Sequence, residues 1–191
     1  MTAGPRRRES FAERRARKAA IDDPAAVLDA AARFLEARSR SVAEVRRRLT
    51  GAGYRPDLVD GAIERMVELG MLDDEAFARA WVESRDRARP RGERAIREEL
   101  RREGVDPTVI DAVLEGRREA AAGLASDDGD GTSVDRVAAE RLFAKHRRNL
   151  DRVADPRQRR QRAYALLARN GFDPETAADV VRRLLDQGPS D

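Results

Sequence analysis

The chain has 191 residues, of which 39% are charged and only 4% aromatic. This composition excludes a thick globular core but is normal for helices that each bury one apolar stripe. The absence of cysteine excludes disulfides, thiolate nucleophiles and cysteine-based zinc sites, which fits a reducing compartment. There is no apolar run near the roughly 20 residues of a membrane span and no apolar N-terminal stretch, so we expect a cytoplasmic location and no membrane partner.

Positive charge is concentrated at the N-terminus. Residues 1–20 contain seven arginine or lysine residues and two glutamates, whereas the whole chain has a net charge of only +3. The basic character therefore belongs to a tail more than to the body. We predict that residues 1–22 form a disordered basic tail that supplies non-specific attraction to polyanions.

The first predicted repeat spans residues 23–70 and contains three helices. Asp23 and Pro24 start the first helix. Ser41 and Glu44 form a capping-box sequence for the second helix.

Two further repeats follow along the chain. The second spans residues 71–116, and its first helix opens at Asp73 and Asp74. Residues 117–132 combine a helix extension with a glycine- and aspartate-rich break, which predicts a flexible joint. The third repeat spans residues 133–188.

The repeats are recognised from three segments that align without gaps, residues 45–63, 96–114 and 163–181. In each, a glycine stands where a helix C-terminus needs a left-handed residue, and a proline suited to the next helix follows three residues later. These residues are Gly53, Gly104 and Gly171, with Pro56, Pro107 and Pro174. We expect the residue after each glycine to fill the joint between the two helices; these are Tyr54, Val105 and Phe172.

Repeats with so few large apolar side chains bury too little surface to fold well alone. We therefore predict an all-α fold in which three tandem three-helix repeats form an elongated, curved solenoid-like body. Such a body usually offers a long surface to a binding partner.

The sequence contains no pattern typical of catalysis. His146, the one histidine, lies in a basic stretch, and a P-loop, a GxGxxG motif and a nucleophile elbow are all missing. Asp73, Asp74 and Glu75 could hold a cation, but a helix opening explains them better because carboxylates there cap free N–H groups. We therefore expect a binding protein that is not an enzyme, with no catalytic residue, metal or cofactor.

Two stretches are rich in cationic side chains. Residues 85–102 contain eight arginines and four acidic residues, and residues 145–162 contain eight cationic and two acidic residues. They fit a phosphate backbone or an acidic protein surface, but solubilising i,i+4 pairs explain them equally well. The candidate partner-binding residues are Arg85, Arg87, Arg89, Arg91, Arg94 and Arg97 in the first stretch, and Lys145, Arg147, Arg148, Arg159 and Arg160 in the second.

Residues 70–105 include GMLDDEAFARAWVESR and then RGERAIREELRREGV, and this block resembles the central part of the RecX family of recombination regulators. The resemblance depends on Asp73, Asp74, Phe77, Ala78, Gly92, Ile96, Leu100 and Gly104. Members of that family have three tandem three-helix units, so the resemblance extends over about residues 23–188. It is less typical in the first helix of the third unit.

The resemblance implies a non-enzymatic modulator, usually an inhibitor, of the RecA recombinase. Such a protein binds the RecA filament on single-stranded DNA and suppresses ATP hydrolysis, strand exchange and co-protease activity. We expect a monomer, and direct contact with single- or double-stranded DNA stays open. Two other classes also stay open: a DNA-binding helical-repeat protein that acts through its tail and arginine stretches, and a helical adaptor for an unrelated protein.

Overall fold

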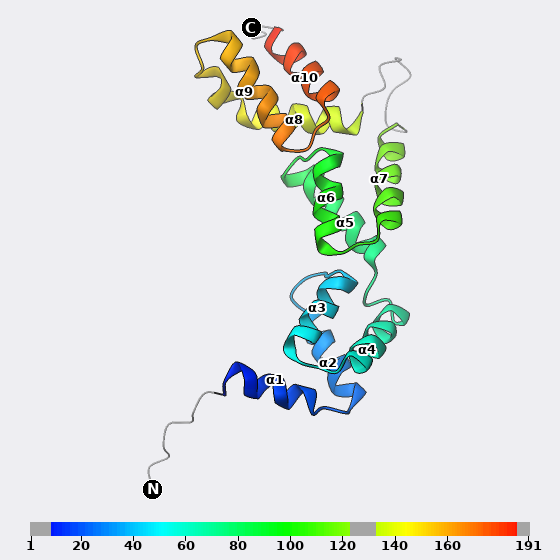
Figure 1. Ribbon diagram of the computed structural model, residues 1–191. Helices are drawn as coiled ribbons and strands as arrows, with labels where there is room; N and C mark the ends of the chain where they lie inside the picture. Colours follow the sequence, from blue (N-terminus) through cyan, green and yellow to red (C-terminus); the bar gives the residue numbers. More distant parts are fainter. Residues whose placement is uncertain (1–8, 123–132, 187–191) are drawn as a thin grey trace. The chain divides into compact units, whose positions relative to one another are not determined.

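The computed structural model describes residues 9–122 and 133–186, and every regular element in these ranges is an α-helix (Figure 1). The helices are α1 (Phe11–Ala19), α2 (Pro24–Leu35), α3 (Val42–Ala52), α4 (Pro56–Glu68), α5 (Asp74–Ala88), α6 (Glu93–Glu103), α7 (Pro107–Ala122), α8 (Val134–Asp151), α9 (Pro156–Arg169) and α10 (Pro174–Asp186). The predicted all-α class is confirmed, with successive three-helix repeats formed by α2–α4, α5–α7 and α8–α10. The elongated, curved body stays a prediction. The chain divides into two compact units, Met1–Phe77 and Ala78–Asp191.

The core of the first unit lies between α2, α3 and α4, which pack on one another. Its buried side chains recur mostly at three- or four-residue spacing, as on one face of a helix. They include Val27 and Ala31 of α2, Val45 and Leu49 of α3, and Val59, Ala62, Ile63 and Met66 of α4.

The second unit buries apolar side chains from each of its two repeats. In the second repeat these include Val82, Ile96, Leu100, Ile110 and Leu114. The helices of the third repeat, α8, α9 and α10, contact one another around a core cluster of their own. Its largest members are Phe143, Leu167 and Phe172.

The repeated glycine and proline positions have the predicted conformations. The φ angles of Gly53, Gly104 and Gly171 are 102°, 85° and 84°, in the left-handed region that only glycine adopts without strain. Helices α4, α7 and α10 begin at Pro56, Pro107 and Pro174. Tyr54, Val105 and Phe172, which follow the glycines, are all buried.

Part of the N-terminal tail is helical, which corrects the prediction that residues 1–22 are disordered. Ser10 and Glu13 cap α1 reciprocally: the Glu13 N–H donates to the Ser10 hydroxyl oxygen at 3.2 Å, and the Ser10 N–H donates to the Glu13 carboxylate at 2.7 Å. Helix α1 packs against the turn after α3, where a Cβ at Gly53 would lie 2.5 Å from the Arg15 side chain. Ser10 and Glu13 stand three residues apart, which is a capping-box spacing that favours a helix start at this point. The residues before Glu9 lie outside the described part of the chain.

Helix α7 continues beyond the second repeat. It reaches Ala122, which agrees with the helix extension predicted at the start of residues 117–132. The sequence RREAAA over residues 117–122 consists of good helix formers, which explains the extension. The rest of the predicted joint, residues 123–132, lies outside the described residues.

Candidate functional site

Two glycines bring the start of α6 into contact with the turn between α9 and α10. The Gly92 N–H donates to the carbonyl oxygen of Asn170 at 3.0 Å. A Cβ added at Gly92 would lie 2.3 Å from the Gly171 carbonyl oxygen, and one added at Gly171 would lie 2.4 Å from Ala95. Because only glycine permits this approach, the contact fixes the first turn of α6 beside the end of α9.

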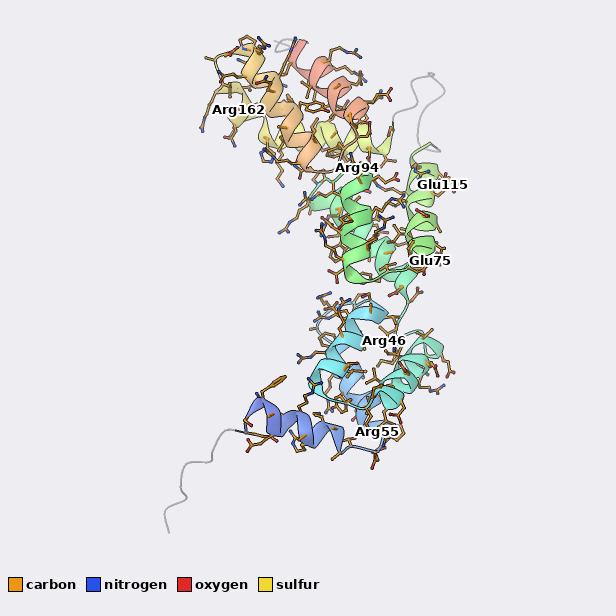
Figure 2. All side chains as sticks on the ribbon, viewed as in Figure 1. Arg46, Arg55, Glu75, Arg94, Glu115 and Arg162 are labelled. Atoms are coloured by element: carbon orange, nitrogen blue, oxygen red, sulfur yellow. The ribbon has the colours of Figure 1, made fainter. Side chains whose placement is uncertain are left out.

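An open groove lies at this contact, and we call it the arginine groove. It is lined by Arg94, Arg97, Arg101 and Arg102 of α6 and by Arg169 of α9, and its volume is about 490 Å³. Figure 2 labels Arg94 at the start of α6. Among the described side chains that line the groove, Glu98 is the one carboxylate. Five guanidinium groups against one carboxylate suit a polyanion, either phosphate groups or an acidic protein surface.

The arginines of the groove differ in the hydrogen bonds and ion pairs that they form within the chain. Arg97 donates to Glu93 at 3.0 Å and also pairs with Asp111. The hydrogen bond to Asp111 raises the pKa of Arg97, and burial opposes it. Arg94, Arg101 and Arg169 form no hydrogen bond or ion pair through their side chains with any described residue. A binding partner therefore contacts these three side chains without displacing a group of the described chain.

A buried arginine holds the same junction together. The Arg117 side chain is only 6% exposed, and its Nη2 and Nη1 atoms lie 2.8 Å from Asp86 and 2.7 Å from Asp135. Burial lowers the pKa of Arg117, but the hydrogen bonds to the two carboxylates raise it, and the net direction is upward. Asp135 also accepts the Glu93 N–H at 2.9 Å, so it caps α6 where Gly92 has no side chain to do so.

Two of the candidate arginines in residues 85–102 form ion pairs with Glu99. Arg85 Nε donates to Glu99 at 2.6 Å, and its guanidinium lies 4.4 Å from the centroid of the Trp81 ring. Arg91 Nε lies 3.5 Å from Glu99, and its Nη1 donates to the Asn170 side chain at 2.7 Å. These arginines, like Arg97, contribute to the fold.

Two of the candidates in residues 145–162 also bind the backbone. Lys145 Nζ donates to the Ala88 carbonyl at 3.3 Å and so places a cation at the C-terminus of α5. Arg159 Nε donates to the Val153 carbonyl at 3.0 Å. Both contacts stabilise helix ends or turns.

The other candidates face solvent, and the structure does not gather all eleven into one surface. These six residues, all exposed, are Arg87, Arg89, Arg94, Arg147, Arg148 and Arg160. Of these, Arg94 lines the arginine groove and Arg160 lines a second groove beside Tyr164.

The candidate set left out three residues of the arginine groove, Arg101, Arg102 and Arg169. Arg94 and Arg101 are seven residues apart and share a face of α6, so helical periodicity could have linked them. Nothing in the sequence links Arg169 to α6, because that proximity depends on the contact between Gly92 and Gly171.

The acidic cluster at the start of α5 caps helices. Asp73 accepts the Glu75 and Ala76 N–H groups at 2.8 Å and 3.0 Å. Asp74 accepts the Val42 N–H at 2.9 Å and thereby caps α3. Burial raises the pKa of Asp74, the Val42 N–H lowers it and the charge of Asp73 raises it, with a net upward shift.

Across residues 9–122 and 133–186, no three His, Asp or Glu side chains are arranged to hold a metal ion. Among the helices of the described ranges, none is both long and apolar enough to cross a membrane. The arginine groove and the groove beside Tyr164 are two surface grooves whose described linings are rich in arginine.

Comparison with known proteins points to one family. Family models of the first and second three-helix domains of RecX match residues 28–66 and 73–114. The regulatory protein RecX of Mycobacterium sp. (strain JLS) is 37% identical over 149 residues, which cover 78% of this chain and 76% of that protein. The RecX protein of Mycolicibacterium vanbaalenii is 36% identical over 155 residues, covering 78% and 77% of the two chains. The crystal structure of RecX from Lactobacillus salivarius has a similar fold, with a TM-score of 0.69 at 18% identity over 86% of this chain and 97% of that one.

Proposed function

Because this chain belongs to the RecX family of regulatory proteins, we propose that it binds the RecA filament on single-stranded DNA and inhibits ATP hydrolysis, strand exchange and co-protease activity. Its relatives are named as regulatory proteins and the chain is not an enzyme. The proposal requires a cytoplasmic location, where RecA acts, and a monomer that binds along the filament.

The arginine groove is the observation that carries this proposal. Arg94, Arg101 and Arg169 have no described partner inside the chain, and they come from two different repeats. The glycine contact and the Arg117 bridge hold these repeats in register. These contacts fix the backbone positions of the arginines before a partner arrives, so binding has to order only their side chains. The backbone of the groove is therefore preorganised for an acidic or phosphate-bearing surface.

Several modest contacts made by linked repeats reinforce one another. Once one repeat is bound, the effective concentration of the next is high, so the affinity of the whole chain can exceed that of a single repeat by roughly 10²-fold.

The direct test is the rate of ATP hydrolysis by RecA on single-stranded DNA as the full chain is titrated in. The proposal predicts a decrease that saturates when the chain is stoichiometric with its sites on the filament. An unchanged rate at a large excess of chain, with RecA confirmed to be on the DNA, would refute inhibition of RecA.

A second candidate function is plain DNA binding, which the five arginines of the groove also favour. The salt dependence of binding distinguishes plain DNA binding from RecA-directed binding. Binding to phosphates alone weakens linearly in a plot of log K against log salt, because each contact releases a counterion. RecA-directed binding should persist at a salt concentration that removes the chain from naked DNA, whereas equal salt sensitivity on both would favour plain DNA binding.

A further inference from the structure

Tyr164 stands out among the aromatic side chains of the second unit. It is 39% exposed, whereas Phe143 and Phe172 in the same repeat are buried. Its hydroxyl forms no hydrogen bond with any described residue. Ala163, the preceding residue, and Leu167, one turn later, supply the packing of α9 on its own repeat. The Tyr164 ring therefore lies outside the core of the repeat.

The ring borders a shallow groove between α9 and α10. The apolar part of its lining is Tyr164 with Ala178 and Val181, and the polar part is Arg160, Gln161 and Arg182. The groove has a volume of about 530 Å³, and none of the described residues that line it is acidic. An exposed aromatic ring thus lies between guanidinium groups supplied by two helices.

The cations beside the ring are accessible. Arg160 precedes Tyr164 by one helical turn, and its residue is exposed. Arg182 pairs with Asp179 at 2.6 Å, but its side chain is 72% exposed. Exposed ion pairs contribute little net stability, so a phosphate can replace Asp179 as the partner of Arg182.

The groove beside Tyr164 and the arginine groove are both lined in part by α9. Ala168 follows Tyr164 by four residues on the same face of α9, about 6 Å along the helix axis. Ala168 and Arg169 line the arginine groove. The two grooves therefore lie about one helical turn apart along α9.

From this arrangement we infer that the groove beside Tyr164 binds single-stranded nucleic acid, with one base stacked on the Tyr164 ring and the adjoining phosphates held by Arg160 and Arg182. Single strands expose base faces to aromatic side chains, and a cationic groove follows their backbone. An acidic protein segment would satisfy the arginines but has no need of an exposed ring, and duplex DNA keeps its base faces stacked. Binding at this site does not require RecA, so it can be tested independently of the proposed regulation.

The test measures binding to a fluorescently labelled oligothymidine of about 12 nucleotides, with RecA absent, by fluorescence anisotropy. An abasic oligonucleotide of the same length and charge is the matched ligand. Tyr164→Ala should weaken binding to oligothymidine by about 5- to 150-fold, which is the worth of one stacked base. Its binding to the abasic strand should not change.

Three variants keep the result specific. Tyr164→Phe retains the ring and should bind like wild type, and Tyr164→Leu retains the apolar cover over Val181 but should bind as weakly as Tyr164→Ala. Phe11→Ala removes the 65% exposed aromatic side chain on α1 and should leave binding unchanged. Wild-type affinity of Tyr164→Ala for oligothymidine, or an equal loss on both strands, would overturn the inference. A loss confined to RecA filaments would overturn it too and would identify a protein-docking surface.

Discussion

The Asp135 carboxylate accepts the backbone N–H of Glu93 at 2.9 Å, and the Asp74 carboxylate accepts that of Val42 at the same distance. In both cases an acidic residue in the first turn of one repeat caps the second helix of the repeat before it. The caps satisfy N–H groups that an isolated helix leaves unpaired. The same kind of cap thus occurs once in each compact unit, and the arginine groove lies next to the one formed by Asp135.

The first prediction concerns the cap at Asp74. Asp74→Ala should lower the free energy of unfolding by about 1 kcal/mol, the usual cost of losing a helix cap. Asp74→Asn keeps an oxygen acceptor and should be as stable as wild type or slightly more stable at neutral pH. Burial is the largest effect on Asp74 and raises its pKa. Ionisation of Asp74 therefore favours the unfolded state. The stability difference between Asp74→Asn and wild type should vanish as the pH falls through that pKa, because Asp74 is then protonated. Urea unfolding at several pH values checks this, and a loss in Asp74→Asn equal to that in Asp74→Ala would contradict it.

The second prediction concerns Arg117. Arg117→Ala leaves Asp86 and Asp135 without their shared cation and should cost about 3 kcal/mol of unfolding free energy. The neighbouring Arg118 is 48% exposed, so Arg118→Ala should cost less than about 1 kcal/mol. Adding Asp86→Asn and Asp135→Asn to Arg117→Ala should restore part of the loss, because the unpaired charges are then removed. Similar losses in the two single variants would show that Arg117 does not hold the junction.

The third prediction concerns the glycine contact. Gly92→Ala would place a Cβ 2.3 Å from the Gly171 carbonyl oxygen and should cost about 1–3 kcal/mol as the backbones separate. A Cβ added at Gly116 of α7 would meet nothing within 4 Å beyond the backbone of its own helix, so Gly116→Ala should stabilise the chain by up to about 1 kcal/mol through helix propensity. Thermal melting followed by circular dichroism separates the two, and a neutral Gly92→Ala would mean that the contact is dispensable.

The fourth prediction concerns acid stability. The Thr108 hydroxyl and N–H lower the pKa of Asp106, and for Asp173 burial raises the pKa but hydrogen bonds from Thr176 outweigh it. Both pKa values lie below the ordinary 3.8, so the stability these groups add is present above that value and is lost as the pH falls through the lower folded values. The melting temperature should therefore decrease as the pH is lowered below about 4. Asn at both positions keeps the caps and should flatten this dependence; an unchanged pH profile would contradict the assignment.

The repeat could be predicted from the sequence because its signals are local. A left-handed turn needs glycine and a helix start tolerates proline, so Gly53 with Pro56 and its two counterparts mark the hairpins without any knowledge of tertiary contacts.

The candidate site could not be predicted as well, because charge counts do not say which arginines the fold uses. Arg85 and Arg91 meet Glu99, which lies 14 and eight residues away along the chain, and the sequence gives no sign of that pairing. Arg169 joins the groove only through the contact between Gly92 and Gly171. Helix α1 has a local signal, the capping box formed by Ser10 and Glu13, whereas a high density of arginine does not by itself indicate disorder.

If the arginine groove makes the regulatory contact with RecA, a variant of the groove should inhibit RecA less well, as measured by RecA ATP hydrolysis on single-stranded DNA. The variant combines Arg94→Ala, Arg101→Ala and Arg169→Ala, and its control makes the same change of net charge on the first unit.

The control replaces Arg33, Arg46 and Arg65 by Ala; all three are exposed. We predict that the control inhibits RecA like the wild-type chain, whereas the groove variant needs at least about 10-fold more protein for the same inhibition, as expected for the loss of a few charge-assisted contacts. Equal inhibition by the groove variant and the control, with both variants as stable as wild type, would contradict the account.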